Sequence, residues 1–271
     1  MKFTKMAGAG NDFLVLESQK GINYKILAQK MCHRTNGVGA DGLLILDKSK
    51  KADYRMRIIN ADGSEAEMCG NGARCMAAYI VKNKKPRKKQ FAMETLAGNI
   101  VAQAKGETAI VVLSDPKNFK PEIPLTINGN KIHVHYIDTG VPHVVIYVEG
   151  LSKIDVKNIG QIIRFHKKFA PRGTNVNFVE QISNSLVAAR TYERGVEGET
   201  RACGTGSVAA ALCSYMIANP KCKNKKNAHM KVLTTSKEIL DITFDIIKMN
   251  VANVRLKGNA KFIAEGNFIL K

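Results

Sequence analysis

The chain has 271 residues, and 45% of them are hydrophobic, which is enough for one large core or two ordinary ones and excludes disorder as the default state. The first residues, 1–13, lack the continuous apolar core of a signal peptide, and no apolar run reaches the length that spans a bilayer. We therefore expect a soluble, cytoplasmic protein with no membrane partner.

The formal net charge of +19 favours attraction to phosphates and raises nucleic-acid binding as one function class. Much of the excess lies in Lys82–Lys89 and Lys221–Lys231, which contain no interleaved aromatic residues on which bases could stack. We interpret both runs as solvated loops that follow helices, and we expect no nucleic-acid partner.

Hydrophobic periodicity predicts many strands and few helices. In chain order the predicted elements are a strand from Asn11, a helix at Tyr24–Cys32, a strand at Tyr54–Ile58, a helix at Ala73–Val81, strands at Ile110–Leu113, Lys131–Ile137 and Val144–Val148, helices at Asp155–His166 and Ser207–Ala218, and strands at Glu238–Ile246 and Lys261–Ile269. Periodicity alone leaves open which half of the chain the last strand joins.

The chain repeats a motif. Cys69–Tyr79 and Cys203–Cys213 both read C-G-x-G followed by an Ala-rich helical stretch, and a weaker echo links Asn11–Val15 with Asn175–Val179. Prolines cluster from Pro116 onward, between strand patterns. The sequence therefore predicts two similar α+β domains, with a first boundary at 115/116 and a second near residue 257, each a sheet wrapped about its helix.

A cysteine at a helix start has a chemical consequence. The first N–H groups of a helix lack acceptors within the helix and carry partial positive charge, so they favour a thiolate and a nearby carboxylate. The glycines after Cys69 and Cys203 leave room for a ligand to approach the backbone. One thiolate and one thiol on opposite faces of an α-carbon can invert it, so the motif pair favours a racemase or epimerase that needs no pyridoxal phosphate.

Packing alone is the alternative explanation for a cysteine before an Ala-rich helix, but it does not require cysteine at both helix starts. Four further cysteines receive the packing interpretation or no role: Cys32, Cys75, Cys213 and Cys222. The sequence contains no CxxC pair, and we expect no metal site and no cofactor.

Four segments carry a resemblance to a known family: Gly8–Phe13, Asn60–Gly72, Tyr192–Gly195 and Ala202–Gly206. On these motifs the chain closely resembles the diaminopimelate epimerase family over essentially its whole length. The resemblance implies two pseudo-symmetric domains of the diaminopimelate epimerase-like fold, each a strongly curved, mostly antiparallel sheet around a central helix. It further implies that the last strand returns to the first domain, which gives 1–115 with 258–271 and 116–257.

The resemblance also implies a function, the interconversion of LL- and meso-diaminopimelate on the route to lysine and peptidoglycan. Cys203 would accept the proton and Cys69 would donate one in the LL-to-meso direction, with His143 and Glu193 tuning the thiols. Implied substrate contacts are Asn11, Asn60, Gly70, Asn71, Asn175, Glu193, Arg194, Gly204 and Thr205. The resemblance implies a homodimer as well.

Alternatives remain open on the residues themselves. Asn60 also suits a turn, Asn11 a left-handed loop, and Glu193 with Arg194 a surface ion pair. Val141 stands where many family members have Asn, which weakens distal recognition of the substrate. Other two-thiol racemases, acting for example on histidine or proline, are the nearest rival, and an isomerase of related fold without paired cysteines is disfavoured because both thiols are present.

Overall fold

The computed structural model describes residues 1–269, and the chain divides into two compact units. Unit 1 comprises Met1–Val112 with Lys257–Lys271, and unit 2 comprises Leu113–Leu256. The last two residues of the expected segment 258–271 lie outside the described residues. Whether each unit is an independent folding domain stays a prediction.

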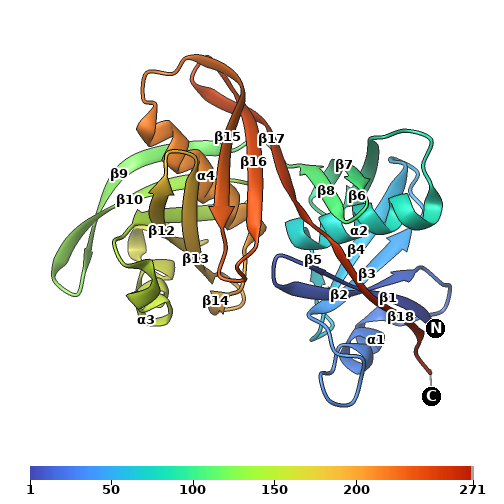
Figure 1. Ribbon diagram of the computed structural model, residues 1–271. Coiled ribbons are helices and arrows are strands. Elements are labelled where there is room, and N and C mark those ends of the chain that lie inside the picture. Colours follow the sequence, from blue (N-terminus) through green and yellow to red (C-terminus); the bar gives the residue numbers. More distant parts are fainter. Residues whose placement is uncertain (270–271) are drawn as a thin grey trace. The chain divides into compact units, whose positions relative to one another are not determined.

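Unit 1 is built mainly from strands (Figure 1). Its elements are β1 (Lys2–Gly8), β2 (Asn11–Glu17), α1 (Tyr24–Met31), β3 (Gly42–Asp47), β4 (Tyr54–Asn60), β5 (Glu65–Ala66), α2 (Gly70–Lys84), β6 (Phe91–Thr95), β7 (Gly98–Lys105), β8 (Thr108–Val112) and β18 (Lys261–Asn267). Helix α2 contacts β1 to β4 as well as β7 and β8, so the strands curve around it. Strand β18 pairs with β1, which confirms that the last strand joins the first half of the chain.

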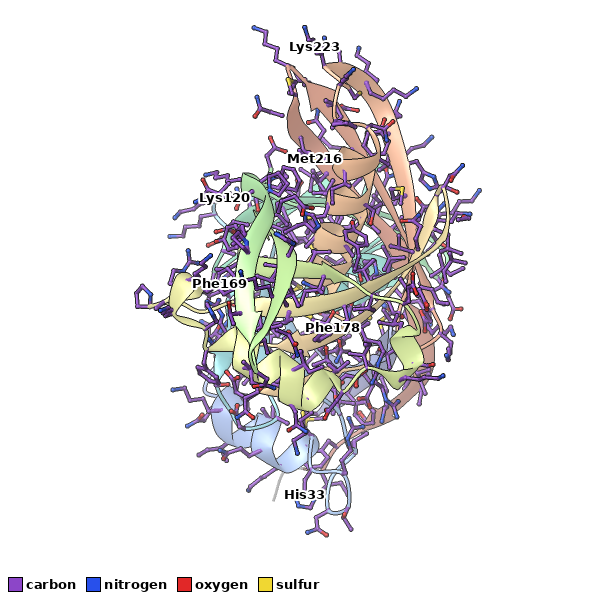
Figure 2. The ribbon with its side chains drawn as sticks, turned by 90° about the vertical axis from the view of Figure 1, so that its left-hand side faces the viewer. His33, Lys120, Phe169, Phe178, Met216 and Lys223 are labelled. Carbon is purple, nitrogen blue, oxygen red and sulfur yellow. The ribbon has the colours of Figure 1, made fainter. Side chains whose placement is uncertain are left out.

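Unit 2 has the same character. Its elements are β9 (Lys117–Ile127), β10 (Asn130–Asp138), β11 (Pro142–Tyr147), the 3-10 turn η1 (Leu151–Lys153), α3 (Val156–Arg164), the 3-10 turn η2 (Lys167–Phe169), β12 (Asn175–Ser183), β13 (Leu186–Glu193), β14 (Gly198–Thr200), α4 (Gly204–Ala218), β15 (Asn224–Leu233), β16 (Ile239–Ile247) and β17 (Asn250–Asn259), whose end passes into unit 1. Helix α4 contacts β10 to β13 as well as β15 and β16. Side chains such as Phe178 fill the core, while Lys223 points outward at the surface (Figure 2).

The two units repeat one order of elements, in which β1 to β8 with α1 and α2 correspond to β10 to β17 with α3 and α4. The pairings repeat as well: β2 with β3 and β11 with β12 are parallel, as are β4 with β6 and β13 with β15. The hairpins β6–β7 and β15–β16 are antiparallel. The α+β class with two pseudo-symmetric, mostly antiparallel halves is therefore confirmed.

One expected detail of the repeat is wrong. Asn11 opens β2, whose counterpart by element order is β11, whereas Asn175 opens β12, whose counterpart is β3. The echo between them joins strands that are not equivalent, because a polar residue followed by apolar ones begins many strands. The cysteine repeat is correct, since α2 and α4 occupy the same place in both units.

The basic runs also differ from expectation. Lys82 and Lys84 form the last turn of α2, where cations complement the carbonyl end of a helix. Most of Lys221–Lys231 belongs to strand β15, in which the lysines are exposed while Ala228 and Met230 are buried. A half-buried strand accommodates lysine on its solvent face, so a high lysine content did not indicate a loop here.

No helix within residues 1–269 is both long and apolar enough to cross a membrane.

Candidate active site

In unit 1, Cys69 is the N-cap of α2. Its backbone is extended, with φ −142° and ψ 115°, and its Sγ accepts a hydrogen bond from the Gly72 N–H at 3.4 Å. A Cβ atom added to Gly72 would lie 2.9 Å from Leu44 Cδ2, so this glycine allows α2 to approach strand β3. The predicted position of Cys69 at a helix start is correct.

A polar network orients the asparagines next to this thiol. Asn71 Nδ2 donates to Asn11 Oδ1 at 2.7 Å, and Asn11 Nδ2 donates to Asp41 Oδ2 at 2.9 Å. From inside the helix, Arg74 donates to Asn71 Oδ1 at 2.8 Å and to the Gly70 carbonyl at 3.3 Å. The structure therefore brings Asn11, Gly70 and Asn71 together beside Cys69, as expected.

Two members of this network, Arg74 and Asp41, were missed by the sequence analysis. Arg74 lies inside an Ala-rich helix and is fully buried, although arginine is rarely buried without partners. Its position three residues after Asn71, on one face of the helix, was the available signal. Asp41 precedes β3 in the chain and offers no sequence signal of its own.

Asn60 ends β4, beside this network. It pairs in register with Gly42, and the next N–H, of Ala61, donates to the Asp41 carbonyl at 3.1 Å. Its side chain donates to Ser64 Oγ at 3.0 Å. Asn60 is therefore at once a turn residue and a neighbour of the Asn11 network.

In unit 2, Cys203 is the N-cap of α4 and repeats the geometry of Cys69. Its backbone is extended, with φ −109° and ψ 116°, and its Sγ accepts from the Gly206 N–H at 3.4 Å. The Thr205 hydroxyl lies 3.5 Å from the same sulfur, and Thr139 Oγ1 donates to the Thr205 carbonyl at 3.3 Å. Cys203 is 6% exposed. The second unit therefore offers a nearly buried thiol at a helix N-terminus.

Glu193 ends β13 and reaches this thiol. Burial raises the pKa of the Glu193 carboxyl above its usual value, while hydrogen bonds with Thr200 and Cys203 act in the opposite direction. A carboxyl in contact with a thiol can influence how readily the thiol loses its proton. The contact is consistent with the expected tuning role of Glu193.

His143 lies in β11 and is fully buried. Burial lowers the pKa of its imidazole to about 3, and the positive charge of Arg194 acts in the same direction. The ring is therefore neutral at physiological pH. Its Nδ1 lies 3.2 Å from Asn177 Nδ2, a residue that the sequence analysis mentioned only within a strand.

Asn175 and Arg194 lie next to one another. Asn175 Nδ2 donates to the Pro142 carbonyl at 3.0 Å, and Asn175 Oδ1 accepts from the Arg194 backbone N–H at 2.8 Å. The Arg194 guanidinium donates to the Arg172 carbonyl at 3.2 Å, so it is not paired with Glu193 as a surface ion pair. Val141 lies in the turn that precedes β11. The structure thus groups Asn175, Arg194 and His143 at one end of the unit 2 strands.

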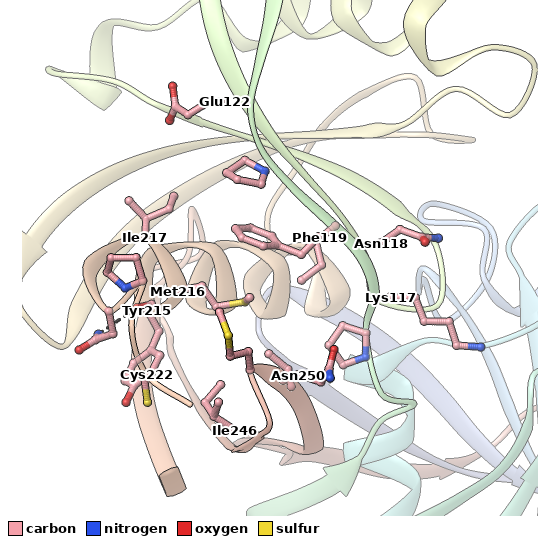
Figure 3. Close-up of a pocket in the computed structure, with 17 residues that line it drawn as sticks. Lys117, Asn118, Phe119, Glu122, Tyr215, Met216, Ile217, Cys222, Ile246 and Asn250 are labelled. Atoms are coloured by element: carbon pink, nitrogen blue, oxygen red, sulfur yellow. Dashed lines mark hydrogen bonds between the residues drawn. The ribbon is translucent and has the colours of Figure 1, made fainter. Parts of the chain in front are cut away.

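A cavity lies at the C-terminal end of α4, the end opposite to Cys203 (Figure 3). Its volume is about 680 Å³, and its walls include Phe119, Met216, Ile246 and Cys222. Because α4 has 15 residues, its two ends are about 22 Å apart. This cavity therefore has no part in the chemistry of Cys203. Within residues 1–269, no three His, Cys, Asp or Glu side chains are grouped so that they could hold a metal ion.

Comparison with solved structures defines the fold. A PhzF-family phenazine biosynthesis protein from Bacillus anthracis matches with a TM-score of 0.73 at 17% identity, covering 100% of this chain and 99% of that one. A probable proline racemase from Agrobacterium radiobacter matches with a TM-score of 0.72 at 13% identity, covering 100% and 93%. At such identities the likeness shows the fold alone, which is the one shared by PhzF-type proteins and proline racemases.

Sequence comparison identifies the family within that fold. The family model described as diaminopimelate epimerase matches residues 3–120 and 135–254. The diaminopimelate epimerase of Aquifex aeolicus is 40% identical, covering 98% of this chain and 97% of that protein, and that of Chlorobaculum tepidum is 36% identical, covering 98% and 100%. The chain belongs to the diaminopimelate epimerase family.

Proposed function

We propose that this chain interconverts LL- and meso-diaminopimelate without a cofactor, using Cys69 and Cys203 as a pair of acid and base. The observation that carries the proposal is the repetition of one arrangement: each thiol is the N-cap of the equivalent helix in its unit and accepts the N–H of the second glycine. Membership of the diaminopimelate epimerase family supports the choice of substrate.

In the LL-to-meso direction, the Cys203 thiolate removes the α-proton, and the electron pair left on the α-carbon spreads onto the adjacent carboxylate. The Cys69 thiol then gives its proton to the opposite face of the α-carbon and becomes the thiolate. The reverse reaction starts from that state. The helix starts at Gly70, Asn71, Gly204 and Thr205 would hold the carboxylate, because helix N-termini stabilise the negative charge that grows in the transition state.

The far end of the substrate needs its own recognition. Arg194 can pair with the distal carboxylate through two parallel N–H donors, and Asn11, Asn60 and Asn175 can bind the remaining polar groups. At position 141 the valine side chain offers no hydrogen bond. We infer that the asparagines and Arg194 hold the distal amino and carboxylate groups, without a hydrogen bond from position 141.

The proposal extends to the setting of the enzyme. We infer a cytoplasmic isomerase of lysine and peptidoglycan precursor synthesis that acts as a homodimer and does not bind nucleic acid. The last inference rests on the solvent-facing lysines of α2 and β15, which carry part of the +19 charge and maintain solubility.

The decisive experiment is incubation with LL-diaminopimelate in D2O, with meso product and α-deuterium followed by NMR. Wild-type protein is expected to yield deuterated meso product. Cys69→Ala should lose inversion by more than about 10²-fold while still exchanging the α-proton of the LL isomer, because the Cys203 base remains. Cys203→Ala should lose inversion to the same extent while still exchanging the α-proton of the meso isomer, because the Cys69 base remains.

Cys222→Ala is the matched control, since this thiol lines the cavity near the C-terminal end of α4, whereas Cys203 is the N-cap of that helix, and it should retain full activity. Inversion by either helix-start variant at a near wild-type rate would refute the two-thiol mechanism. Turnover of proline or histidine in place of diaminopimelate would refute the substrate and retain the mechanism.

A further inference from the structure

Three polar side chains form a buried hydrogen-bonded chain in unit 2, on adjacent strands. Thr191 Oγ1 donates to Asn177 Oδ1 at 3.0 Å, and Asn177 Nδ2 lies 3.2 Å from His143 Nδ1. Exposure is 0% for His143 and Asn177 and 5% for Thr191. Buried polar groups of this kind fix one another's orientation, because each unmade hydrogen bond is costly.

The chain determines where the imidazole carries its proton. Asn177 Nδ2 also donates to the Val144 carbonyl at 2.8 Å, and a carbonyl can only accept. The amide nitrogen, not its oxygen, therefore faces His143. Since that nitrogen is a donor, His143 Nδ1 must be the acceptor, and the proton of the neutral ring resides on Nε2.

Nε2–H is thus a donor, and it is buried with no hydrogen-bond acceptor within residues 1–269. An unsatisfied buried donor destabilises the fold, so its presence calls for an acceptor that binds there. His143 is hydrogen-bonded to Asn177, whose Oδ1 would lie 2.4 Å from a Cβ atom added to Gly206. The Gly206 N–H donates to Cys203 Sγ, so His143 lies near the helix start that would hold the carboxylate at the reacting centre. A ligand carboxylate is an acceptor of the right chemistry.

Comparison of the two units shows that the fold does not require these polar residues. In unit 1 the parallel pairing of β2 with β3 begins at Phe13 and Gly42, and in unit 2 the parallel pairing of β11 with β12 begins at His143 and Asn175. Phe13 therefore corresponds to His143. Two residues further along these strands, Leu44 corresponds to Asn177, and each lies against the second glycine of the C-G-x-G motif in its own unit. The hairpin partners Ile58 and Thr191 are then equivalent.

Unit 1 therefore fills the three positions with apolar side chains that are as well buried: Phe13 at 4%, Leu44 at 0% and Ile58 at 3% exposure. An apolar trio satisfies the packing of this architecture without any unmade hydrogen bond. The polar trio of unit 2 is consequently a feature of its site and not of its fold.

We propose that Asn177 is a positioning residue that holds His143 as the neutral Nε2–H tautomer, so that His143 donates a hydrogen bond to the substrate carboxylate at the reacting centre. His143 then acts as a donor and not as a base. The identity of the acceptor rests on the proposed function, whereas the tautomer follows from Asn177 alone.

Nitrogen NMR of the ¹⁵N-labelled full chain without ligand tests the tautomer directly. His143 is assigned by the signal that His143→Phe removes. Wild-type protein should show a protonated Nε2 and an unprotonated Nδ1. Asn177→Asp places a carboxylate at Nδ1 and should move the proton to that nitrogen. Asn177→Leu, the residue of unit 1, should leave the proton divided between the two.

The matched control is Asn184→Asp, the same change in the exposed turn of the same hairpin, and it should leave the tautomer unaltered. A wild-type spectrum with the proton on Nδ1 overturns the proposal even if no variant folds. An unaltered Nε2–H form in both Asn177 variants overturns it as well.

Steady-state kinetics with diaminopimelate separate positioning from folding. The Asn177 variants should lose about 10²-fold in kcat, the usual effect of one donor at a growing negative charge, with KM within about threefold of wild type. An altered tautomer with unaltered kcat overturns the positioning role. If wild-type protein does not turn over diaminopimelate, the proposed function fails, and the NMR result still decides whether Asn177 sets the tautomer.

Discussion

Gly206→Ala tests how closely α4 packs against β12. A Cβ atom at Gly206 would lie 2.4 Å from Asn177 Oδ1 and 3.3 Å from Cys203 Sγ. Asn177 cannot move away at low cost, because it would weaken its hydrogen bonds with Thr191 at 3.0 Å and with the Val144 carbonyl at 2.8 Å. The extra methyl group therefore acts on the candidate site as well as on the core.

The magnitude follows from opposing effects. Replacing glycine by alanine in a helix gains at most about 1 kcal/mol. Overpacking of a close contact costs about 1–3 kcal/mol, and each weakened hydrogen bond costs about 1 kcal/mol. We expect a net loss of about 2 kcal/mol in the free energy of unfolding, which lowers the Tm by roughly 4–8 °C for a unit of this size. Epimerisation should also fall, because Cys203 Sγ is displaced.

Urea unfolding and thermal scans measure the loss, with two variants for comparison. Gly198→Ala adds a methyl group where no atom lies within 4 Å and should remain close to wild type. Gly72→Ala meets Leu44 Cδ2 at 2.9 Å, a methyl group that can rotate away, so its loss should be smaller. If Gly206→Ala were as stable and as active as wild type, the close packing of α4 on β12 would be wrong.

Three further predictions concern buried polar groups. Arg74→Met should raise KM and cost about 2–4 kcal/mol in urea unfolding, because Asn71 loses its charged donor, whereas full retention of both would contradict that network. The pKa of folded His143 is about 3 against about 6.5 in the unfolded chain, so unfolding takes up a proton between these values. Stability should therefore fall below pH 6.5, by up to about 1.4 kcal/mol per pH unit from this residue. His143→Phe should remove that part of the slope in unfolding measured at several pH values, and an unchanged slope would refute it. Glu193→Gln should lower kcat and alter the acid limb of the pH profile, because Glu193 contacts Cys203 and has a raised pKa; an identical profile would exclude a tuning role.

The sequence was sufficient where the determining interactions are local. The helices at 24–32, 155–166 and within the two C-G-x-G segments follow from apolar spacing and from the cap residue next to it, and the structure has them all. Cys69 and Cys203 were recognisable as helix caps because a cap depends on only a few consecutive residues. The motif was repeated, so the duplication was visible as well.

Only the tertiary structure decided which residues share an environment across strands. The equivalence of Asn177 with Leu44, and of His143 with Phe13, depends on strand register, which is set by pairing between distant segments. The false echo between Asn11 and Asn175 arose because the polar start of a strand does not specify its neighbour.

The same reason explains Arg74, which the sequence presents as an ordinary helical cation and the fold buries against Asn71. It also explains the lysines of β15, whose solvent face exists only because β13 and β16 pair with that strand. Local patterns placed the two cysteines at helix starts, whereas long-range packing selected the groups that surround them, since a side chain acquires its partners only when the sheet has formed.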